Sequence, residues 1–326
     1  MKLVRFYPLN YYPISPRLGV VEGAKVIDLA SAYRVYLIKS NQCEVSSAKK
    51  ISEILFPEDV VAFFENGIIS MEAAKKGIEL ANENACEFYN EKTYYHLNEV
   101  ELLSPIGRPN SLRDFISFEE HIKNARAKKN ESVPKQWYEI PAYYKGNPDT
   151  IIGPNEEIIW PSYSKKMDYE LEIACIIGKS GKNIIAEEAD EYIAGFTIMN
   201  DFSARDIQAK EVEVGLGPAK GKDFATALGP YIVTKDSLVN PYNLEMTARV
   251  NGEIWSRGNS STIYRTFNKM IEYVSNDEGI KAGDVFGSGT VGLGCGLELN
   301  KFIKINDEIE LEIEGLGILK NKIVGN

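Results

Sequence analysis

The sequence predicts an α+β protein that is mainly β, with a smaller N-terminal β/α domain and a larger domain of mixed, mostly antiparallel sheet. Apolar residues at helical spacing concentrate in residues 46–89, whereas short apolar runs between turn residues dominate from residue 105 onward. The few helices expected there do not alternate with the strands, which argues against a doubly wound parallel sheet. We expect domains at residues 1–104 and 105–326.

The N-terminal domain should begin with a β-hairpin and continue with helices. "RLGVVEGAKVIDLA" places two short apolar strands around a turn at Glu22 and Gly23. "KKISEILFPEDVVAFFENG" and "SMEAAKKGIELANENACEFYN" then show apolar residues at helical spacing. Ser70 is the expected N-cap of the second of these helices. The Pro/Gly-bearing stretch "ELLSPIGRPN" ends the domain near residue 104.

The larger domain should contain many strands and one clear helix. Strands are expected at residues 158–160, 171–177, 192–200, 231–234, 245–250 and 308–313. A turn is expected at Asn251 and Gly252, directly after the strand at 245–250. "STIYRTFNKMIEYVSN", residues 261–276, has the apolar spacing of a helix.

The charge and apolar patterns exclude some classes of partner. The 326 residues include 37 Lys and Arg against 47 Asp and Glu, a formal net charge of −10. An acidic chain without a basic tract argues against nucleic acid and anionic membranes as main partners. No apolar run reaches the roughly 20 residues that cross a bilayer. "MKLVRFYPLNYYPIS" lacks the apolar core of a signal peptide, so we expect a cytoplasmic protein.

Cysteine and histidine usage narrows the chemistry. The four cysteines lie far apart and form no CxxC or CxxH pattern: Cys43, Cys86, Cys175 and Cys295. This spacing argues against a thiolate zinc site and against a disulfide framework. The two histidines are His96 and His121, so histidine-based chemistry within one chain must use one of them.

The stretch "MDYELEIACIIG" places carboxylates directly before a buried apolar run. Asp168, Glu170 and Glu172 are spaced two apart, so a continuous strand would present all three on one face. One interpretation is a solvated edge strand. The other is a site for a divalent cation such as Mg²⁺ or Ca²⁺, which takes carboxylate oxygens as ligands. Choosing between them requires further ligands elsewhere.

"AGFTIMNDFSARDIQAKE" offers a further carboxylate. Its apolar strand ends at Asp201, and Ser203 is the expected cap of a short helix. A carboxylate at a strand end is either a functional group or a charge at a helix N-terminus. Arg205, Asp206 and Gln208 follow, which suits either substrate binding or a surface network of ion pairs.

"RDFISFEEHIKNARAKK" supplies the candidate base. Asp114 and His121 are seven residues apart, which places them on one side of a helix or at the two ends of a loop–helix element. A histidine that titrates near neutrality is the usual general base, and a structural role is the alternative.

Two glycine-rich stretches offer backbone and polar groups. "GLGPAKGKDFATALGPY" lacks the Walker spacing, so Lys222 is better interpreted as a fixed positive charge for an oxyanion. "GSGTVGLGCG" contains a GxGxxG match without a following helix. A loop that lets the backbone approach a ligand, with Thr290 as its polar group, fits that stretch better.

Together these stretches resemble the fumarylacetoacetate hydrolase family. "DYELE", "MNDFSARDIQ", "GPAKGKDFATALGPY" and "GSGTVG" occur in the family's order, and the resemblance spans essentially the whole chain. "DFISFEEH" is similar to the longer fumarylacetoacetase-like branch. The resemblance implies a mixed β-roll catalytic domain and a homodimer.

The resemblance also implies a role for each matching residue. The implied ligands of Mg²⁺ or Ca²⁺, with Mn²⁺ as a further candidate, are Asp114, Glu170, Glu172 and Asp201, with Lys222 and Thr226 beside them. The implied catalytic groups are His121 as general base, Glu298 as the residue that orients it, and Arg205, Gln208 and Lys222 as oxyanion stabilisers. The implied substrate contacts are Tyr144, Thr290, Gln208 and Lys222.

The activity implied is metal-dependent hydrolysis of a C–C bond in a 1,3-diketo acid of the fumarylacetoacetate or acylpyruvate type, as in aromatic catabolism. His121 would deprotonate the attacking water. Dehydration, decarboxylation or isomerisation of a 2-oxo acid through an enolate is the alternative, and a structural subunit with a vestigial cation site is a third interpretation. Ile116, Val212 and Asn130 depart from the family's substrate-contacting residues, which predicts an altered specificity.

Overall fold

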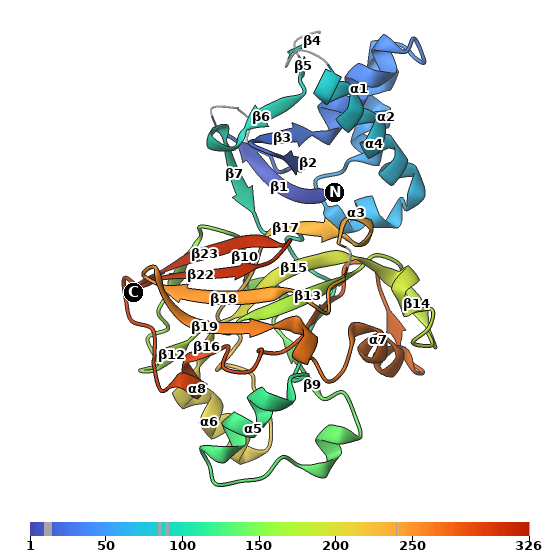
Figure 1. Ribbon diagram of the computed structural model, residues 1–326. Helices are drawn as coiled ribbons and strands as arrows, with labels where there is room; N and C mark the ends of the chain where they lie inside the picture. Colours follow the sequence, from blue (N-terminus) through green and yellow to red (C-terminus); the bar gives the residue numbers. More distant parts are fainter. Residues whose placement is uncertain (10–14, 84–86, 89–90, 239, 326) are drawn as a thin grey trace.

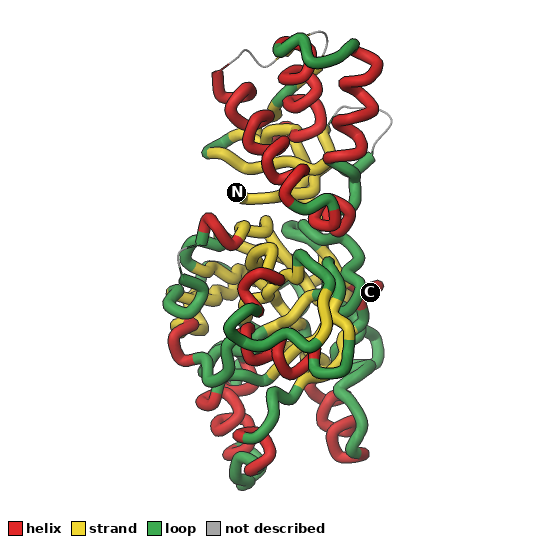
Figure 2. Tube along the Cα trace, turned by 90° about the vertical axis from the view of Figure 1, so that its right-hand side faces the viewer, coloured by secondary structure: helices red, strands yellow, loops and turns green. Residues whose placement is uncertain are grey.

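The protein is described by a computed structural model that covers residues 1–9, 15–83, 87–88, 91–238 and 240–325. The N-terminal strands and helices form one body, and the remaining strands and helices form a second, larger one (Figure 1). Helices gather at both ends of the elongated molecule, with strands between them (Figure 2). The fold is α+β and mainly β, which confirms the predicted class.

In its described residues, the N-terminal body combines short strands with four helices. Its strands are β1 (Lys2–Pro8), β2 (Arg17–Glu22), β3 (Lys25–Asp28), β4 (Glu87–Phe88), β5 (Glu91–Lys92), β6 (Tyr94–His96) and β7 (Val100–Leu103). Its helices are α1 (Leu29–Lys39), α2 (Val45–Leu55), α3 (Val60–Glu65) and α4 (Ile68–Glu83). The antiparallel pair β2–β3 confirms the predicted hairpin. Gly23 in its turn has a φ of +58°, a backbone conformation that favours glycine.

The main sheet crosses from the N-terminal body into the larger one. Among the described residues its order is β6-β3-β2-β1-β17-β15-β13-β21-β8-β9, with β7 beside β1 and β10 beside β17. The strands not yet bounded are β8 (Leu112–Phe115), β9 (Tyr143–Gly146), β10 (Ile151–Ile152), β13 (Glu172–Ile177), β15 (Ile193–Asp201), β17 (Thr226–Thr234) and β21 (Val285–Gly287). Because β1 pairs with β17, a division of the chain into domains at residue 104 stays a prediction.

A second sheet packs against the main one. Its order is β11 (Glu157–Ile159), β23 (Gly317–Val324), β22 (Glu308–Ile313), β18 (Glu245–Val250) and β19 (Glu253–Asn259). Two small pairs are β12 (Met167–Asp168) with β16 (Ser203–Ala204) and β14 (Gly181–Lys182) with β20 (Gly279–Ile280). The helices of this body are α5 (Glu119–Ala127), α6 (Arg205–Val214), α7 (Phe267–Ser275) and α8 (Gly296–Leu299).

Strand β13 explains how the main sheet is buried on both faces. Ile173 and Cys175 belong to the hydrophobic cluster shared with the second sheet. Ala174 and Ile176 belong to the cluster shared with the N-terminal helices. Side chains of a strand alternate between its faces, so a strand covered on both sides needs a continuous apolar run. The apolar run at residues 173–177, which follows Glu172, therefore lies at the centre of the molecule.

Most predicted elements of the larger body are present with shifted ends. The strands predicted at 245–250 and 308–313 match β18 and β22. The strand predicted at 231–234 is the end of the longer β17, and the helix predicted at 261–276 is restricted to α7. The strand predicted at 171–177 is β13, but Asp168, Glu170 and Glu172 do not share one continuous strand, because β12 ends at Asp168 and β13 begins at Glu172.

Both predicted serine N-caps are wrong. Ser70 lies inside α4, and its hydroxyl donates to the backbone oxygen of Leu55 at 2.8 Å. Ser203 lies in β16, and its hydroxyl donates to the backbone oxygen of Asp201 at 3.0 Å. The Ser70 hydroxyl is used by a contact to the end of α2, and the Ser203 hydroxyl by a local contact two residues back along the chain.

None of the helices in the described residues combines the length and the apolar character that crossing a membrane requires. The described cysteines, Cys43, Cys175 and Cys295, are free thiols, and Cys86 lies outside the described residues.

Candidate active site

One pocket of about 590 Å³ collects most of the predicted site residues. The predicted residues that line it are Asp114, His121, Tyr144, Glu170, Glu172, Arg205, Gln208, Lys222 and Thr290. Asp201, Thr226 and Glu298 lie behind its wall, where Asp201 contacts Lys222 and Glu298 contacts His121. Residues from distant parts of the sequence are thus brought to one place.

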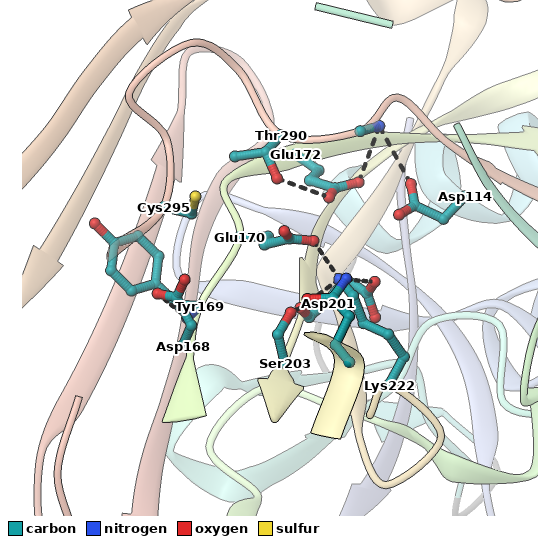
Figure 3. Close-up of polar contacts among 12 residues, drawn as sticks. Asp114, Asp168, Tyr169, Glu170, Glu172, Asp201, Ser203, Lys222, Thr290 and Cys295 are labelled. Atoms are coloured by element: carbon teal, nitrogen blue, oxygen red, sulfur yellow. Dashed lines mark hydrogen bonds and ion pairs between the residues drawn. The ribbon is translucent and has the colours of Figure 1, made fainter. Parts of the chain in front are cut away.

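Three carboxylates converge on one side of the pocket. Asp114 lies on β8, Asp201 ends β15, and Glu170 lies between β12 and β13 (Figure 3). One oxygen atom from each lies within 4.8 Å of the others, and all three side chains are buried. Because Asp114 is on a strand and His121 is on α5, these two residues stand at the two ends of a loop–helix element and do not share a helix.

The strand registers fix two of these carboxylates. Asp114 is the cross-strand partner of Tyr144, and Asp201 is the partner of Thr226. The hydroxyls of Tyr144 and Thr226 both donate to the Asp201 carboxylate, the latter at 3.1 Å. Tyr144 and Thr226 therefore hold Asp201 in one orientation. Burial and the charge of Asp201 raise the pKa of Tyr144 well above its usual value, so its hydroxyl stays a donor.

Lys222 lies between two of the carboxylates. Its ammonium group donates to the carboxylates of Glu170 and Asp201 (Figure 3). Burial opposes the charge of Lys222, but Asp201 and Glu170 outweigh it and raise the pKa of this lysine. The same contact lowers the pKa of Glu170 in spite of burial. Glu170 is therefore ionised, and one fixed positive charge already lies beside the cluster.

A second pair of carboxyl groups, Asp114 and Glu172, is poor in positive partners. The backbone N–H of Gly289 donates to both, at 3.2 Å and 3.1 Å, and the Thr290 hydroxyl donates to Glu172 at 3.4 Å. Burial, with the charge of Asp201 for Asp114 and of Asp114 for Glu172, raises both pKa values well above the usual range. Gly289 has a φ of +78°, and a Cβ there would lie 2.2 Å from the Phe115 oxygen. Only glycine brings its N–H this close.

These residues fit a divalent cation. Carboxylate oxygens are the ligands that Mg²⁺, Ca²⁺ and Mn²⁺ prefer. Burial and the neighbouring carboxylates raise the pKa values of Asp114 and Glu172, and a cation would replace the protons that these groups retain. Within the described part of the chain, the carboxylate oxygens that converge belong to Asp114, Glu170 and Asp201. A direct contact of Glu172 with the cation stays a prediction.

Asp168 links the carboxylates to the other side of the pocket. Its carboxylate accepts hydrogen bonds from Arg205 at 2.7 Å and from the backbone N–H groups of Gly296 and Leu297 at 2.8 and 2.9 Å. Arg205 in turn donates to Glu170 at 2.8 Å. The fully buried Asp168 thus supplies the counter-charge of Arg205 and anchors the first turn of α8. Asp168 is not among the three residues whose oxygens converge, Asp114, Glu170 and Asp201.

Gln208 positions Arg205 from within α6. The two residues are three apart on the helix, and the Gln208 side-chain oxygen accepts from Arg205 at 3.0 Å. The Arg205 guanidinium therefore donates to Asp168, Glu170 and Gln208. The side chains of Arg205 and Gln208 both line the pocket.

The other side of the pocket carries a histidine–glutamate pair. His121 Nδ1 lies 2.8 Å from the Glu298 carboxylate, and both side chains are buried. Asn124 and the backbone N–H of Leu293 donate to the second oxygen of Glu298 at 2.9 and 3.0 Å. Burial opposes ionisation of Glu298, but the contacts with His121 and Asn124 lower its pKa. Glu298 therefore remains an acceptor that fixes the His121 ring and leaves Nε2 for the pocket.

The outer wall of the pocket contains two of the three positions that depart from the family pattern, and the third, Asn130, is not among its lining residues. Ile116 and Val212 both line it, together with Trp137 and Ile140. The Trp137 indole N–H donates to the backbone oxygen of Ile116 at 2.7 Å, which ties these two parts of the wall together. Ile116 and Val212, where the sequence predicts altered substrate specificity, thus offer a substrate apolar contacts.

Sequence reasoning missed three residues of the site. Asp168 had no assigned role, because its partners Gly296 and Leu297 lie more than a hundred residues away. Cys295 was unassigned, although its thiol donates to Glu298 at 3.3 Å. Asn124 also contacts Glu298, and its position three residues after His121 on one helix was the available signal.

The fold and this geometry define a class of protein in which a buried carboxylate site for a cation faces a histidine–glutamate pair across one pocket. Residues 111–324 match the model of the fumarylacetoacetate (FAA) hydrolase C-terminal domain. The chain belongs to the fumarylacetoacetate hydrolase family. It is also similar to the mitochondrial oxaloacetate tautomerase FAHD2A of Homo sapiens, with 34% identity over 272 residues that cover 82% of this chain and 80% of that protein.

Solved structures show the same fold. The fumarylacetoacetate hydrolase of the psychrophile Exiguobacterium antarcticum has a TM-score of 0.71 at 23% identity, covering 99% of this chain and 100% of that one. The maleylpyruvate hydrolase of Sphingobium sp. SYK-6, in complex with manganese(II) and pyruvate, has a TM-score of 0.68 at 20% identity and covers both chains fully. The similarity to the human oxaloacetate tautomerase supports an enzyme, whereas these two structures, both under 25% identical, show the fold alone.

Proposed function

We propose that this chain is a metal-dependent enzyme that interconverts the keto and enol forms of a small 2-oxo acid of the oxaloacetate type. The observation that carries the proposal is the meeting of two groups at one pocket, the Asp114–Glu170–Asp201 cluster and the His121–Glu298 pair. The oxaloacetate tautomerase at 34% identity supports this reaction over others.

Asp114, Glu170 and Asp201 would hold Mg²⁺, Ca²⁺ or Mn²⁺, which supplies Lewis-acid polarisation of a carbonyl group when bound. His121 accepts the proton of the carbon next to that carbonyl through Nε2, because Nδ1 is hydrogen-bonded to Glu298. Glu298 stabilises the resulting imidazolium. The same nitrogen then returns the proton to the carbon or to the oxygen.

Fixed positive charges would stabilise the anion that forms during this transfer. Lys222 and Arg205 both line the pocket and are already oriented by Glu170 and Gln208. Donors that are held in place before the reaction stabilise a developing oxyanion without reorganisation. Tyr144 and Thr290 complete the wall as substrate contacts.

Hydrolysis of a C–C bond in a 1,3-diketo acid is the second candidate, with His121 deprotonating a water. The pocket favours it in one respect: about 590 Å³ with apolar residues such as Ile116 and Val212 exceeds what a four-carbon acid fills. An acyl group beyond the 2-oxo acid would occupy this apolar part. Dehydration or decarboxylation would use the same base and cation.

The test is a substrate panel with the purified protein and Mg²⁺. Oxaloacetate enol decay, followed by its ultraviolet absorbance, measures tautomerisation, and pyruvate release from acylpyruvates or fumarylpyruvate measures hydrolysis. We expect faster enol decay with the protein than with a His121→Ala variant. Pyruvate release without accelerated enol decay would replace the tautomerase proposal by the hydrolase, and turnover of neither would support a structural subunit.

A homodimer, a cytoplasmic location and a role in aromatic catabolism are further parts of this proposal. The human relative is mitochondrial by name. Light scattering of the purified protein tests the dimer, and fractionation of the source cells tests the location.

A further inference from the structure

A second group of possible metal ligands lies beside the carboxylate cluster. His121, Cys295 and Glu298 each place one ligand atom within 4.8 Å of the other two, and all three side chains are buried. The His121 Nδ1 atom and the Cys295 sulfur lie 2.8 and 3.3 Å from the same Glu298 oxygen. Asn124 and the Leu293 N–H donate to the other oxygen of Glu298, and this holds the first oxygen toward His121 and Cys295.

The two groups differ in the cation that they suit. The Asp114–Glu170–Asp201 cluster offers oxygen alone, which suits Mg²⁺, Ca²⁺ and Mn²⁺. The second group offers one nitrogen, one sulfur and one oxygen, a combination typical of Zn²⁺ sites with three protein ligands and an open fourth position. Sequence spacing gave no sign of it, because these ligands come from α5 and from the loop and helix around α8.

The charge of the second group also suits a dication. Glu298 is held in its ionised form by His121 and Asn124. When Zn²⁺ binds, the Cys295 thiol loses its proton to solvent, and the His121 proton moves from Nδ1 to Nε2. One thiolate and one carboxylate then balance the charge of the ion, so a neutral site results in a buried place where unbalanced charge is costly.

We propose that His121, Cys295 and Glu298 form a Zn²⁺ site whose occupation switches the enzyme off. The ion replaces the hydrogen bond from His121 to Glu298, and the imidazole N–H then faces the pocket from Nε2. A nitrogen that carries this proton accepts no proton from a substrate. The ring and the carboxylate need to separate by less than about 1 Å to reach Zn–N and Zn–O distances. The inhibitory part rests on the proposed role of His121, whereas the binding part does not.

The test of binding uses Co²⁺, a spectroscopic substitute for Zn²⁺, added to the full chain in excess Mg²⁺. Mg²⁺ occupies the oxygen cluster, and a Co²⁺–thiolate bond gives a charge-transfer band in the near ultraviolet. We expect this band in the wild type and its loss in Cys295→Ser. Cys175→Ser is the matched control, because Cys175 is equally buried but packs among apolar residues of the main sheet. The Cys175→Ser control should retain the band. Adding Zn²⁺ to the wild type should abolish the band, because Zn²⁺ displaces Co²⁺.

Each result decides the proposal. Absence of the band in the wild type overturns it, whatever the variants show. A band that persists in Cys295→Ser at wild-type intensity also overturns it, because Co²⁺ is then bound by another thiol. If Cys295→Ser does not fold, His121→Ala serves instead, since loss of the nitrogen ligand should weaken Co²⁺ binding at least 10-fold.

The inhibitory part has its own readout. Zn²⁺ should lower turnover in excess Mg²⁺, and the Zn²⁺ concentration for half inhibition should match that for displacement of the Co²⁺ band. Binding without inhibition would retain the site and reject the switch. Absence of turnover under every condition would reject the proposed function and leave the Co²⁺ result unaffected.

Discussion

The two sides of the pocket are built differently. On the cation side, Asp114 and Asp201 lie on strands of the main sheet, and their neighbours Tyr144 and Thr226 are set by strand register. On the proton side, His121 and Glu298 lie on helices of nine and four residues that meet through side chains. The fold itself therefore specifies the cation side, whereas a few polar contacts specify the proton side.

This difference separates two properties of the site. Changes on the cation side should reduce cation binding and turnover together, because the same carboxylates serve both. Changes on the proton side should reduce turnover and leave cation binding intact. Asp168 is the exception, because it contacts Arg205 on one side and the N-terminus of α8 on the other.

Glu170→Gln should have the largest effect. The carboxylate of Glu170 contacts both Lys222 and Arg205, so its loss removes one of the two carboxylate partners of each buried cation and leaves only Asp201 and Asp168 to balance them. We expect turnover to fall about 10³-fold and Mn²⁺ affinity at least about 10-fold. Mn²⁺ binding by electron paramagnetic resonance and initial rates measure the two. Glu310→Gln, which removes a surface ion pair with Lys320, is the control.

Asp168→Asn should affect both sides at once. The Asn side chain has one acceptor oxygen, and its nitrogen donates. It cannot accept from Arg205, Gly296 and Leu297 as both carboxylate oxygens of Asp168 do, so at least one of these contacts is lost. We expect turnover to fall about 10- to 100-fold, with weaker Mn²⁺ binding. Asp206→Asn is the matched control, because Asp206 accepts from Ser164 and Lys165 outside the pocket. Equal effects of the two variants would reject a linking role for Asp168.

Glu298→Gln should affect the proton side alone. The amide keeps the shape of the side chain but removes the charge that stabilises the His121 imidazolium. We expect turnover to fall about 10- to 100-fold at unchanged Mn²⁺ affinity. Weaker Mn²⁺ binding would contradict the separation of the two sides.

The smallest effect concerns pH and thermal stability. Burial, together with neighbouring carboxylates, raises the pKa values of Asp114 and Glu172. Without a cation the folded chain retains protons that the unfolded chain has lost, so these groups lower stability as pH rises above about 4. A bound cation removes this cost. The gain in Tm on adding Mg²⁺ should therefore increase by a few degrees between about pH 6 and about pH 8, and a constant gain would contradict it.

The sequence predicts the cation side better than the proton side for a physical reason. Glu170 stands just before the apolar run of β13 and Asp201 directly after that of β15, so both carboxylates are visible in the sequence, whereas Asp114 is indicated by its spacing to His121 and by the family resemblance. The roles of Asp168 and Cys295 depend on contacts across more than a hundred residues, or on a loop whose path the sequence does not reveal.

Local patterns also failed where other contacts use the same atoms. The Ser70 hydroxyl donates to Leu55 of another helix and the Ser203 hydroxyl to Asp201 two residues earlier, so neither caps the predicted helix. Glu170 lies in the break between β12 and β13, where it forms an isolated β-bridge to Cys295. Alternation along a strand therefore predicted the acidic side chains correctly as a group but not their separate partners.

The measurement that tests the account most directly is Mn²⁺ affinity and turnover of His121→Ala in one preparation. The central claim is that the carboxylate cluster holds a cation and that His121 moves the proton. The account predicts Mn²⁺ affinity within about 2-fold of the wild type and turnover reduced about 10²- to 10⁴-fold. Retained turnover, or loss of Mn²⁺ binding together with turnover, would contradict it.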